Sequence, residues 1–312
     1  MNSQAIKSIS FKVIKNLLIL FLILAIVIVV TGIPLDFNVT IYDGQSLSSV
    51  GMDDLIESVK ENFRMFFSGE IFQLEISGES SLSLLSTALR RSFIVLFGGT
   101  VLALLIGIPK GIIDSRKTNK SGTFKLLQSL IPLSIPDILV IALVQFLAVY
   151  LFHNEIALFG GDLVSPIGND SLRNTIFPII SIAILPAAYI SRVVAIEIED
   201  SFTKPYILAA RGKGCSKYYI IIHHMMKNIL YSILSSFPTI IGIMFSSLII
   251  VERIFAYQGL GFYLIYFYNS PLPLHIAGAG FTLFVVAMAI IYYFIFMVVN
   301  GLKEIILYES EF

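Results

Sequence analysis

The sequence predicts an all-α, polytopic membrane protein with six transmembrane helices, cytoplasmic N and C termini, and a short cytoplasmic helix before the fifth span. The first observation behind this prediction is composition: the 312 residues are 56% hydrophobic and 13% charged, whereas a soluble domain carries about 25% charged residues. The second is a series of long apolar runs, and the third is an uneven distribution of Lys and Arg between the loops that join them. Together these observations exclude an ordinary soluble enzyme.

Six apolar runs approach the length that a membrane helix needs, which is about 20 residues for a hydrocarbon core of about 30 Å. They are residues 17–33, 92–108, 126–152, 176–190, 229–251 and 281–299. The fifth and sixth contain no Asp, Glu, Lys or Arg. Prolines lie in or beside several runs, which is acceptable because neighbouring membrane helices satisfy the carbonyl groups that proline leaves free. We therefore expect a multi-pass protein of the cell membrane.

The first run has two interpretations, because Lys7, Lys12 and Lys15 precede it as they would precede a secretory signal. A signal peptide needs a small-x-small cleavage site after the apolar stretch. The chain instead continues Thr-Gly-Ile-Pro-Leu over residues 31–35. We expect an uncleaved first helix.

The basic residues predict the orientation, since cytoplasmic loops carry an excess of Lys and Arg. With the N-terminus inside, only six of the 21 basic residues face outward. These six are Lys60, Arg64, Arg90, Arg91, Arg173 and Arg253. The opposite orientation places the basic loops outside and is rejected.

Charge and motif content exclude several functions. The net charge is zero, so there is no basic field for nucleic acid. Cys215 is the single cysteine, which permits neither an internal disulfide nor a thiolate metal cluster. The sequence lacks the G-x4-G-K-[ST] phosphate cradle, so the chain is not itself an ATPase of that kind and is expected to bind no cofactor of its own.

Residues 34–91 form the longest predicted outer segment. Apolar residues recur at helical spacing over 53–67, which predicts an amphipathic helix at the membrane surface. A small solvated cap is the simpler interpretation of the whole segment, and its role stays open. The third predicted outer segment, 252–280, is rich in aromatic residues and suits the membrane interface or a partly buried re-entrant piece.

The most informative stretch is residues 204–228, a polar and basic island between two apolar runs. Pro205 suits the first turn of a helix, and Gly214 suits a helix end that needs a left-handed residue. Between them lie two small residues that allow close approach and two cations that suit an acidic partner. These residues are Ala209, Ala210, Arg211 and Lys213. The island is either a short helix presented to a partner protein or a solvated, positive-inside loop.

Four other residues or pairs are candidates for function. His223-His224 resembles a metal pair, but adjacent helical residues point about 100° apart, so packing is favoured and no metal site is predicted. Asp137 follows Pro136 within the third run, where it either caps a restarted helix or lines a pathway. Gln145, two turns later, is a second candidate pathway residue. Glu252 is interpreted as an anchor at the outer end of the fifth span.

Two groups of residues carry a resemblance to a known family. Tyr206-Ile207, Ala209-Ala210-Arg211, Lys213-Gly214, His224 and Asn228 resemble the inner-loop signature of ABC importer permeases of the dipeptide/oligopeptide/nickel branch. About 45 residues downstream, Val251-Glu252, Ile254-Phe255 and Gly259-Leu260-Gly261 resemble a second segment of that branch. Leu208 and Gln258 differ from the family pattern, which has an acidic residue and a proline there.

The resemblance covers roughly residues 85–303 and implies a function. It implies the first-permease type of subunit, with a coupling helix that binds an ATP-binding subunit through Tyr206, Ala209, Ala210, Arg211, Lys213 and Gly214. It also implies a second permease subunit, two ATP-binding subunits that hold the ATP, an extracytoplasmic substrate-binding protein and the lipid bilayer as partners. Peptides are the expected cargo, with nickel or a metal chelate as the alternative.

The same resemblance implies a division of the chain. Residues 1–84 hold the N-terminal segment, first helix and outer loop, 85–303 hold the permease core, and 304–312 form a cytoplasmic tail.

Two other classes of protein compete with the permease interpretation. An intramembrane enzyme needs a catalytic set, and the spans contain neither H-E-x-x-H nor paired carboxylates; a passive channel does not need an inner docking helix.

Overall fold

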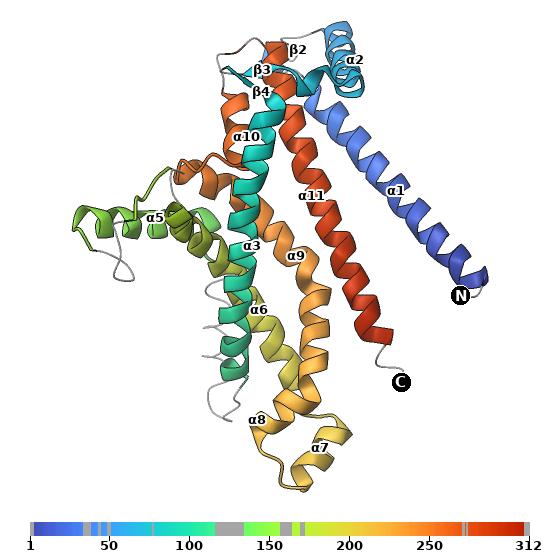
Figure 1. Ribbon diagram of the computed structural model, residues 1–312, viewed down its shortest axis with the longest axis vertical. Helices are drawn as coiled ribbons and strands as arrows, with labels where there is room; N and C mark the ends of the chain where they lie inside the picture. The colour runs from blue at the N-terminus through green and yellow to red at the C-terminus, as the bar shows by residue number, and fades with distance from the viewer. Residues whose placement is uncertain are drawn as a thin grey trace. The chain divides into compact units, whose positions relative to one another are not determined.

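The chain folds almost entirely into helices, as predicted (Figure 1). The computed structural model describes residues 3–33, 39–42, 45–48, 51–76, 78–115, 134–156, 164–168, 172–269, 272 and 274–308. The chain divides into two compact units, one of Met1–Arg90 with Gly259–Phe294 and one of Arg91–Gln258 with Ile295–Phe312.

The long helices follow the predicted apolar runs. They are α1 (Ser3–Thr31), α3 (Ser81–Asp114), α6 (Ile176–Ser201), α9 (Met226–Ile254) and α11 (Leu274–Tyr308). Within the described residues, five helical stretches are long and apolar enough to cross a membrane, namely Ile14–Thr31, Ser81–Asp114, Arg173–Ser201, Lys217–Ile254 and His275–Glu304. The protein is therefore a polytopic, all-α membrane protein.

The third predicted run, 126–152, is described only in its second part. There the helix α5 (Asp137–His153) is apolar but shorter than the other spans. Residues 116–133 lie outside the described part of the chain.

Most helices extend beyond the apolar runs that predicted them. The run 92–108, for example, lies inside the 34-residue helix α3. At about 1.5 Å per residue this helix is about 51 Å long, more than the hydrocarbon core requires. The additional turns carry polar residues, which hydropathy leaves out although they continue the same backbone hydrogen bonding.

Along the chain, most of the shorter elements lie between α1 and α3, between α6 and α9, or between α9 and α11. They are β1 (Val39–Tyr42), β2 (Gln45–Ser48), α2 (Met52–Ser68), η1 (Glu70–Phe72), β3 (Glu75–Ile76), β4 (Glu79–Ser80), η3 (Leu172–Thr175), α7 (Pro205–Gly212), α8 (Lys217–Ile220), the π-helix η4 (Ile221–Met225) and α10 (Leu260–Tyr268). The strands form two antiparallel hairpins, β1 with β2 and β3 with β4. In the first hairpin Val39 pairs with Ser48 and Tyr42 with Gln45.

In the first unit, polar side chains join the helices to one another. The Ser58 hydroxyl of α2 donates to the carbonyl of Gly32, at 2.8 Å, directly after α1. The buried Asn62 amide of α2 donates to Thr282 of α11 at 2.7 Å. Because apolar contacts alone give little preference between helices in lipid, such bonds help to select the helix pairs.

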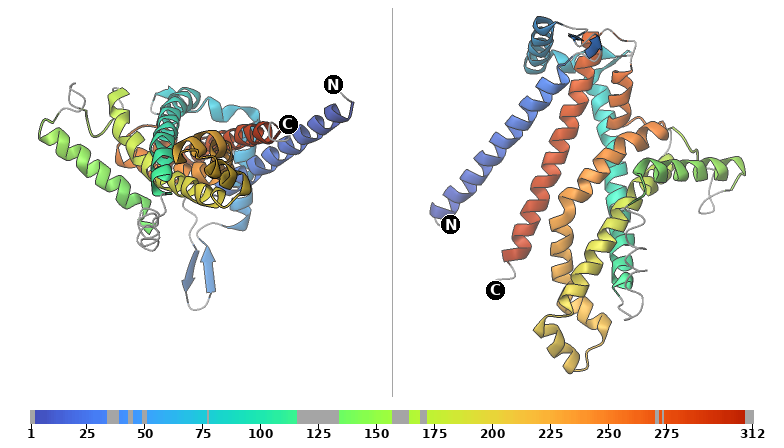
Figure 2. Two further views of the ribbon diagram at one scale, coloured as in Figure 1. Left: turned by 90° about the horizontal axis from the view of Figure 1, so that it is seen from below. Right: turned by 180° about the vertical axis from the view of Figure 1, so that it is seen from behind.

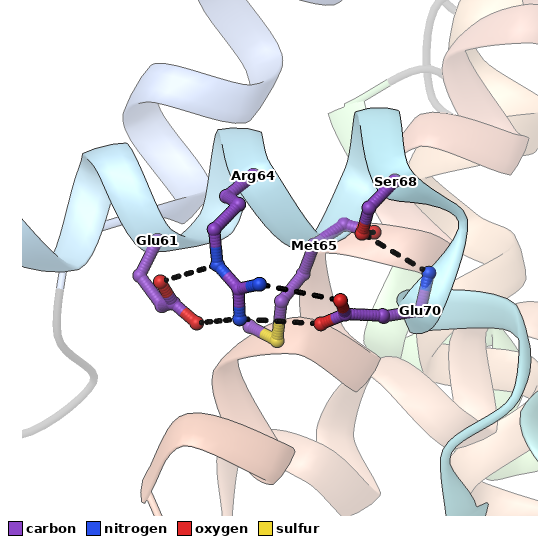
Figure 3. A network of polar contacts seen from close by, with 5 residues as sticks. All are labelled: Glu61, Arg64, Met65, Ser68 and Glu70. Carbon is purple, nitrogen blue, oxygen red and sulfur yellow. Dashed lines mark hydrogen bonds and ion pairs between the residues drawn. The ribbon is translucent and has the colours of Figure 1, made fainter.

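The predicted helix at 53–67 is present as α2, and an ion-pair network continues it into η1 (Figure 3). The Arg64 guanidinium donates to both carboxylate oxygens of Glu61, at 2.6 and 2.9 Å, and to Glu70 at 3.2 Å. The hydrogen bond from Arg64, helped by the charge of Arg64, lowers the pKa of Glu61 below its ordinary value of 4.5. The same carboxylates raise the pKa of Arg64.

In the second unit, α3 approaches α6 closely at glycines. A Cβ added to Gly107 would lie 2.8 Å from the carbonyl oxygen of Ala187, and one added to Gly111 would lie 2.6 Å from that of Ser191. These two glycines are four residues apart, the small-xxx-small spacing typical of tightly packed membrane helices. Beside them, Asp114 of α3 accepts a hydrogen bond from Ser191 at 3.2 Å and is ion-paired with Lys110.

Candidate functional site

The basic island of residues 204–228 folds into α7 and α8, which lie next to each other beyond the ends of α6 and α9 (Figures 1 and 2). Pro205 occupies the first turn of α7, as predicted, after the extended residue Lys204. Gly214 has the left-handed φ of +81° that was expected of a helix end. There the amide of Gly214 donates to Arg211 at 2.9 Å and that of Cys215 to Ala210 at 3.2 Å, which is a Schellman ending.

The helix α7 has one buried and one exposed face. Ile207 is fully buried, and Ala210 is 8% exposed. The exposed face carries the small residue, both cations and two larger side chains. These exposed residues are Tyr206, Leu208, Ala209, Arg211 and Lys213. Of the two alanines expected to allow the approach of a partner, Ala209 alone has an exposed side chain, because Ala210 packs against the rest of the chain.

Contacts on both sides hold α7 in place. The Arg211 guanidinium lies over the ring of Phe202 at 4.3 Å, and the Lys217 ammonium lies 5.4 Å from the same ring. The Asn228 amide of α9 donates to the hydroxyl of Tyr206 at 3.2 Å. Two residues of the sequence motif, 22 positions apart, therefore meet between α7 and α9.

The two adjacent histidines lie on the exposed side of the π-helix η4. The His223 ring stacks on Tyr219 with centroids 4.2 Å apart, and its Nδ1 lies 3.1 Å from the Tyr219 carbonyl oxygen. His224 is also exposed. Within the described residues, no three His, Cys, Asp or Glu side chains gather to hold a metal ion.

The structure places Asp137 in the first turn of α5, after Pro136, as expected of a helix start. One carboxylate oxygen accepts from the Ile138 amide at 2.9 Å, and the other accepts from the Ser247 hydroxyl of α9 at 3.1 Å. Gln145, two turns further along α5, has a buried Oε1 atom without a hydrogen-bond partner among the described residues. Asp137 thus begins α5 and also ties it to α9, whereas Gln145 keeps an unused acceptor.

Glu252 lies near the end of α9 and is fully buried. It accepts a hydrogen bond from Ser92 of α3 at 2.5 Å. Four residues later, Ala256 takes a left-handed φ of +49°, and the Tyr257 amide donates back to the Glu252 carbonyl at 2.8 Å. The role of Glu252 as an anchor at the outer end of the fifth span stays a prediction.

Gln258 has a role that the motif comparison did not suggest. Arg91 donates to its side-chain oxygen at 3.2 Å and to its backbone oxygen at 3.3 Å. A proline in this position would offer only the backbone oxygen. Gly259 caps the start of α10, and Gly261 is buried in its first turn.

One acidic residue that sequence reasoning missed is Glu197, at the α7 end of α6. It accepts from Ser232 of α9 at 2.5 Å and lies 3.9 Å from Lys204, the residue that precedes α7. Its position about two turns before the basic island was a signal, since an acidic residue at the end of an apolar helix needs a partner. The partners themselves, Ser232 and Lys204, could be identified only from the structure.

Comparisons with known proteins show what type of protein this chain resembles. Residues 126–307 match the family described as binding-protein-dependent transport system inner membrane component. A putative peptide permease protein of Brucella ovis is 23% identical over 198 residues, 62% of this chain and 61% of the relative. The dipeptide transport system permease protein of Bacillus subtilis is 28% identical over 167 residues, 53% of this chain and 51% of that protein.

Other matches extend the comparison. A putative peptide transport system permease protein of Brucella abortus is 30% identical over 171 residues, 52% of each chain. The chain spans about three fifths of the length of the first of these relatives. Among solved structures, an inward-facing conformation of the MetNI methionine ABC transporter superposes with a TM-score of 0.54 over 72% of this chain and 97% of that chain. At 18% identity, that likeness shows a shared fold.

Proposed function

Because the chain belongs to the family of binding-protein-dependent transport system inner membrane components, we propose that it is the membrane-spanning permease subunit of an ATP-driven ABC importer. The family consists of transport components and not of enzymes. The subunit would form the translocation pathway with a second permease subunit and work with two ATP-binding subunits and an extracytoplasmic binding protein. Peptides are the proposed cargo, since several relatives are named as peptide permeases.

The observation that carries the proposal is the exposed face of α7. It offers a small residue for close approach, Ala209, next to the exposed cations Arg211 and Lys213. A helix of eight residues held between α6 and α9 has its ends fixed, so a partner that binds it can pull on both long helices. These features support ATP-subunit docking through Tyr206, Ala209, Arg211, Lys213 and the turn at Gly214, with Ala210 supporting the helix from its buried side.

The mechanism follows from two states of the assembly. A nucleotide that favours the closed pair of ATP-binding subunits shifts the equilibrium toward one arrangement of α7. Since α7 is joined to α6 and α9, that shift would tilt the long helices between inward and outward openings. We propose that Asp137 and Gln145 of α5 line the pathway. Asp137 places a carboxylate beside α9, and Gln145 has a buried side-chain oxygen that accepts no hydrogen bond among the described residues.

Docking is tested by changing the size of one exposed side chain. Ala209→Trp should abolish copurification of the chain with its ATP-binding subunits, since the indole would hold the two surfaces apart. Ala209→Ser, which stays small, is the matched control and should copurify like the wild type. Both variants should insert in the membrane normally. Retained association of the ATP-binding subunits with Ala209→Trp would show that α7 is not the docking element.

A further inference from the structure

Glu197 connects three elements at the base of α7. One carboxylate oxygen accepts from the Ser232 hydroxyl of α9 at 2.5 Å. The other accepts from Ser201, one turn further along α6, at 3.4 Å and lies 3.9 Å from the ammonium of Lys204. Lys204 is the residue that caps the start of α7. The carboxylate thus lies where α6, α9 and α7 meet.

The contacts of Glu197 differ in strength. The Glu197 side chain is 20% exposed and that of Lys204 is 41% exposed, so solvent screens their ion pair. The bond from Ser232 is short, charge-assisted and partly buried, and such bonds are about twice as strong as neutral ones. The link between α6 and α9 is therefore the main contribution of this residue.

The position of this link matters for the motion of α7. The helix continues from the end of α6, and its other end continues through α8 and η4 into α9. A displacement of α7 moves α6 and α9 together when these two helices are fixed to each other close to α7. The bond from Asn228 to Tyr206 lies at an exposed site, so water competes with it more than with the bond between Glu197 and Ser232.

We propose that Glu197 is a positioning residue that clamps α6 to α9 at the base of α7, so that a displacement of α7 reaches both long helices as one movement. The clamp itself is a property of this chain, whereas its use in transport rests on the proposed function. Glu197 touches no cargo or nucleotide in this account. It acts by keeping α6 and α9 in a fixed position relative to each other, close to α7.

The clamp is tested in the full-length chain with two spin labels. In a Cys215→Ser background, Asp200→Cys, exposed at the α7 end of α6, carries one label, and Ser246→Cys, on the exposed side of α9, carries the other. About 14 residues of α9 separate Ser232 from position 246, or about 21 Å, a span that double electron–electron resonance measures well. The wild-type background should give one narrow distance distribution, and Glu197→Ala should lose that narrow peak.

Four further variants separate the clamp from general destabilisation. Glu197→Gln keeps a side-chain oxygen for Ser232 and should restore the narrow distribution. Ser232→Ala should broaden the distance distribution. The double variant Glu197→Ala/Ser232→Ala should broaden it little more than either single variant, because both changes remove the same hydrogen bond. Glu199→Ala is the matched control, because two residues along a helix turn the side chain by about 200°. A Glu197→Ala distribution as narrow as the wild type would overturn the clamp.

A second readout addresses coupling in the assembled complex. With a single label at position 246 in a Cys215→Ser background, ATP and vanadate should change the label's spectrum in the wild type. In Glu197→Ala the complex should still hydrolyse ATP, but the spectral change should shrink, and Glu197→Gln should recover it. An undiminished change in Glu197→Ala would contradict the coupling role. Failure of the wild type to bind ATP-binding subunits would instead refute the proposed function and leave the distance test decisive for the clamp.

Discussion

Buried polar side chains in this protein join pairs of helices. Asn62 bonds to Thr282, and Ser92 bonds to Glu252, each pair bringing together residues more than 150 positions apart in sequence. An unpaired polar group in the membrane costs free energy, so each such pair favours one arrangement of its helices over others. The sequence pointed to Asp137 because a carboxylate in an apolar run is conspicuous, and to Glu252 because it lies in a segment that resembles the family. It did not point to Ser92, Ser232 or Asn62, because common polar residues become informative only when their partners are known.

The Glu61–Arg64 pair makes α2 sensitive to acid. Arg64 lowers the pKa of Glu61 in the folded protein below the ordinary value of 4.5. The folded state therefore binds that proton more weakly than the unfolded state, and the stabilisation is complete above pH 4.5. It is lost as the pH falls through the lowered folded value. We predict that hydrogen-exchange protection of α2 decreases below pH 4.5, and that Arg64→Gln reduces this decrease.

The neighbouring cation provides the control for that prediction. Lys60 is exposed and lies on the same helix, but Glu61 receives its hydrogen bonds from Arg64. Lys60→Gln should therefore keep the acid sensitivity of the wild type. Equal loss of sensitivity in both variants would indicate a general charge effect in place of this specific pair.

At the scale of the element, the sequence predicted where helices lie better than where they end. The run 176–190 starts at the first residue of α6, but the helix continues to Ser201 because its later residues pack against the chain while hydropathy falls. Pro205 and Gly214 fixed α7 more closely, since each acts through its own backbone geometry. The sequence predicted neither the burial of Ala210 nor the π-helix η4, because both depend on tertiary packing and not on a local pattern.

The packing of α3 against α6 should be sensitive to a single methyl group. In Gly111→Ala the new Cβ would lie 2.6 Å from both the Ser191 carbonyl oxygen and the Val194 Cβ. Overpacking of this kind costs about 1–3 kcal/mol. Thermal unfolding in detergent should show a lower midpoint temperature for this variant.

The matched control is a glycine with free space around it. A Cβ added to Gly242, in α9, meets no atom within 4 Å. Alanine there should leave the unfolding temperature unchanged or raise it, since Ala favours a helix over Gly by about 0.5–1 kcal/mol. A destabilisation of Gly242→Ala as large as that of Gly111→Ala would refute the close-packing argument.

At the scale of the whole molecule, composition and hydropathy were sufficient to predict a polytopic helical membrane protein. The family match over 126–307 and the two motifs agree on the type of protein, while the division at residues 84 and 303 and the inward orientation of the termini stay predictions. The proposed pathway forms between two permease subunits, so the sequence of one subunit does not identify the cargo or the complete set of pore-lining residues. Asp137 and Gln145 are therefore candidates for this subunit's part of the pathway.

Docking of an ATP-binding subunit requires that α7 lie on the cytoplasmic side, within reach of that subunit. Cys215 directly follows the turn that ends α7 and is partly exposed, so the natural chain carries its own reporter. A membrane-impermeant maleimide should label Cys215 in inverted vesicles and not in right-side-out vesicles, and co-assembled ATP-binding subunits should slow the labelling. Labelling from the outer side alone would contradict the central claim.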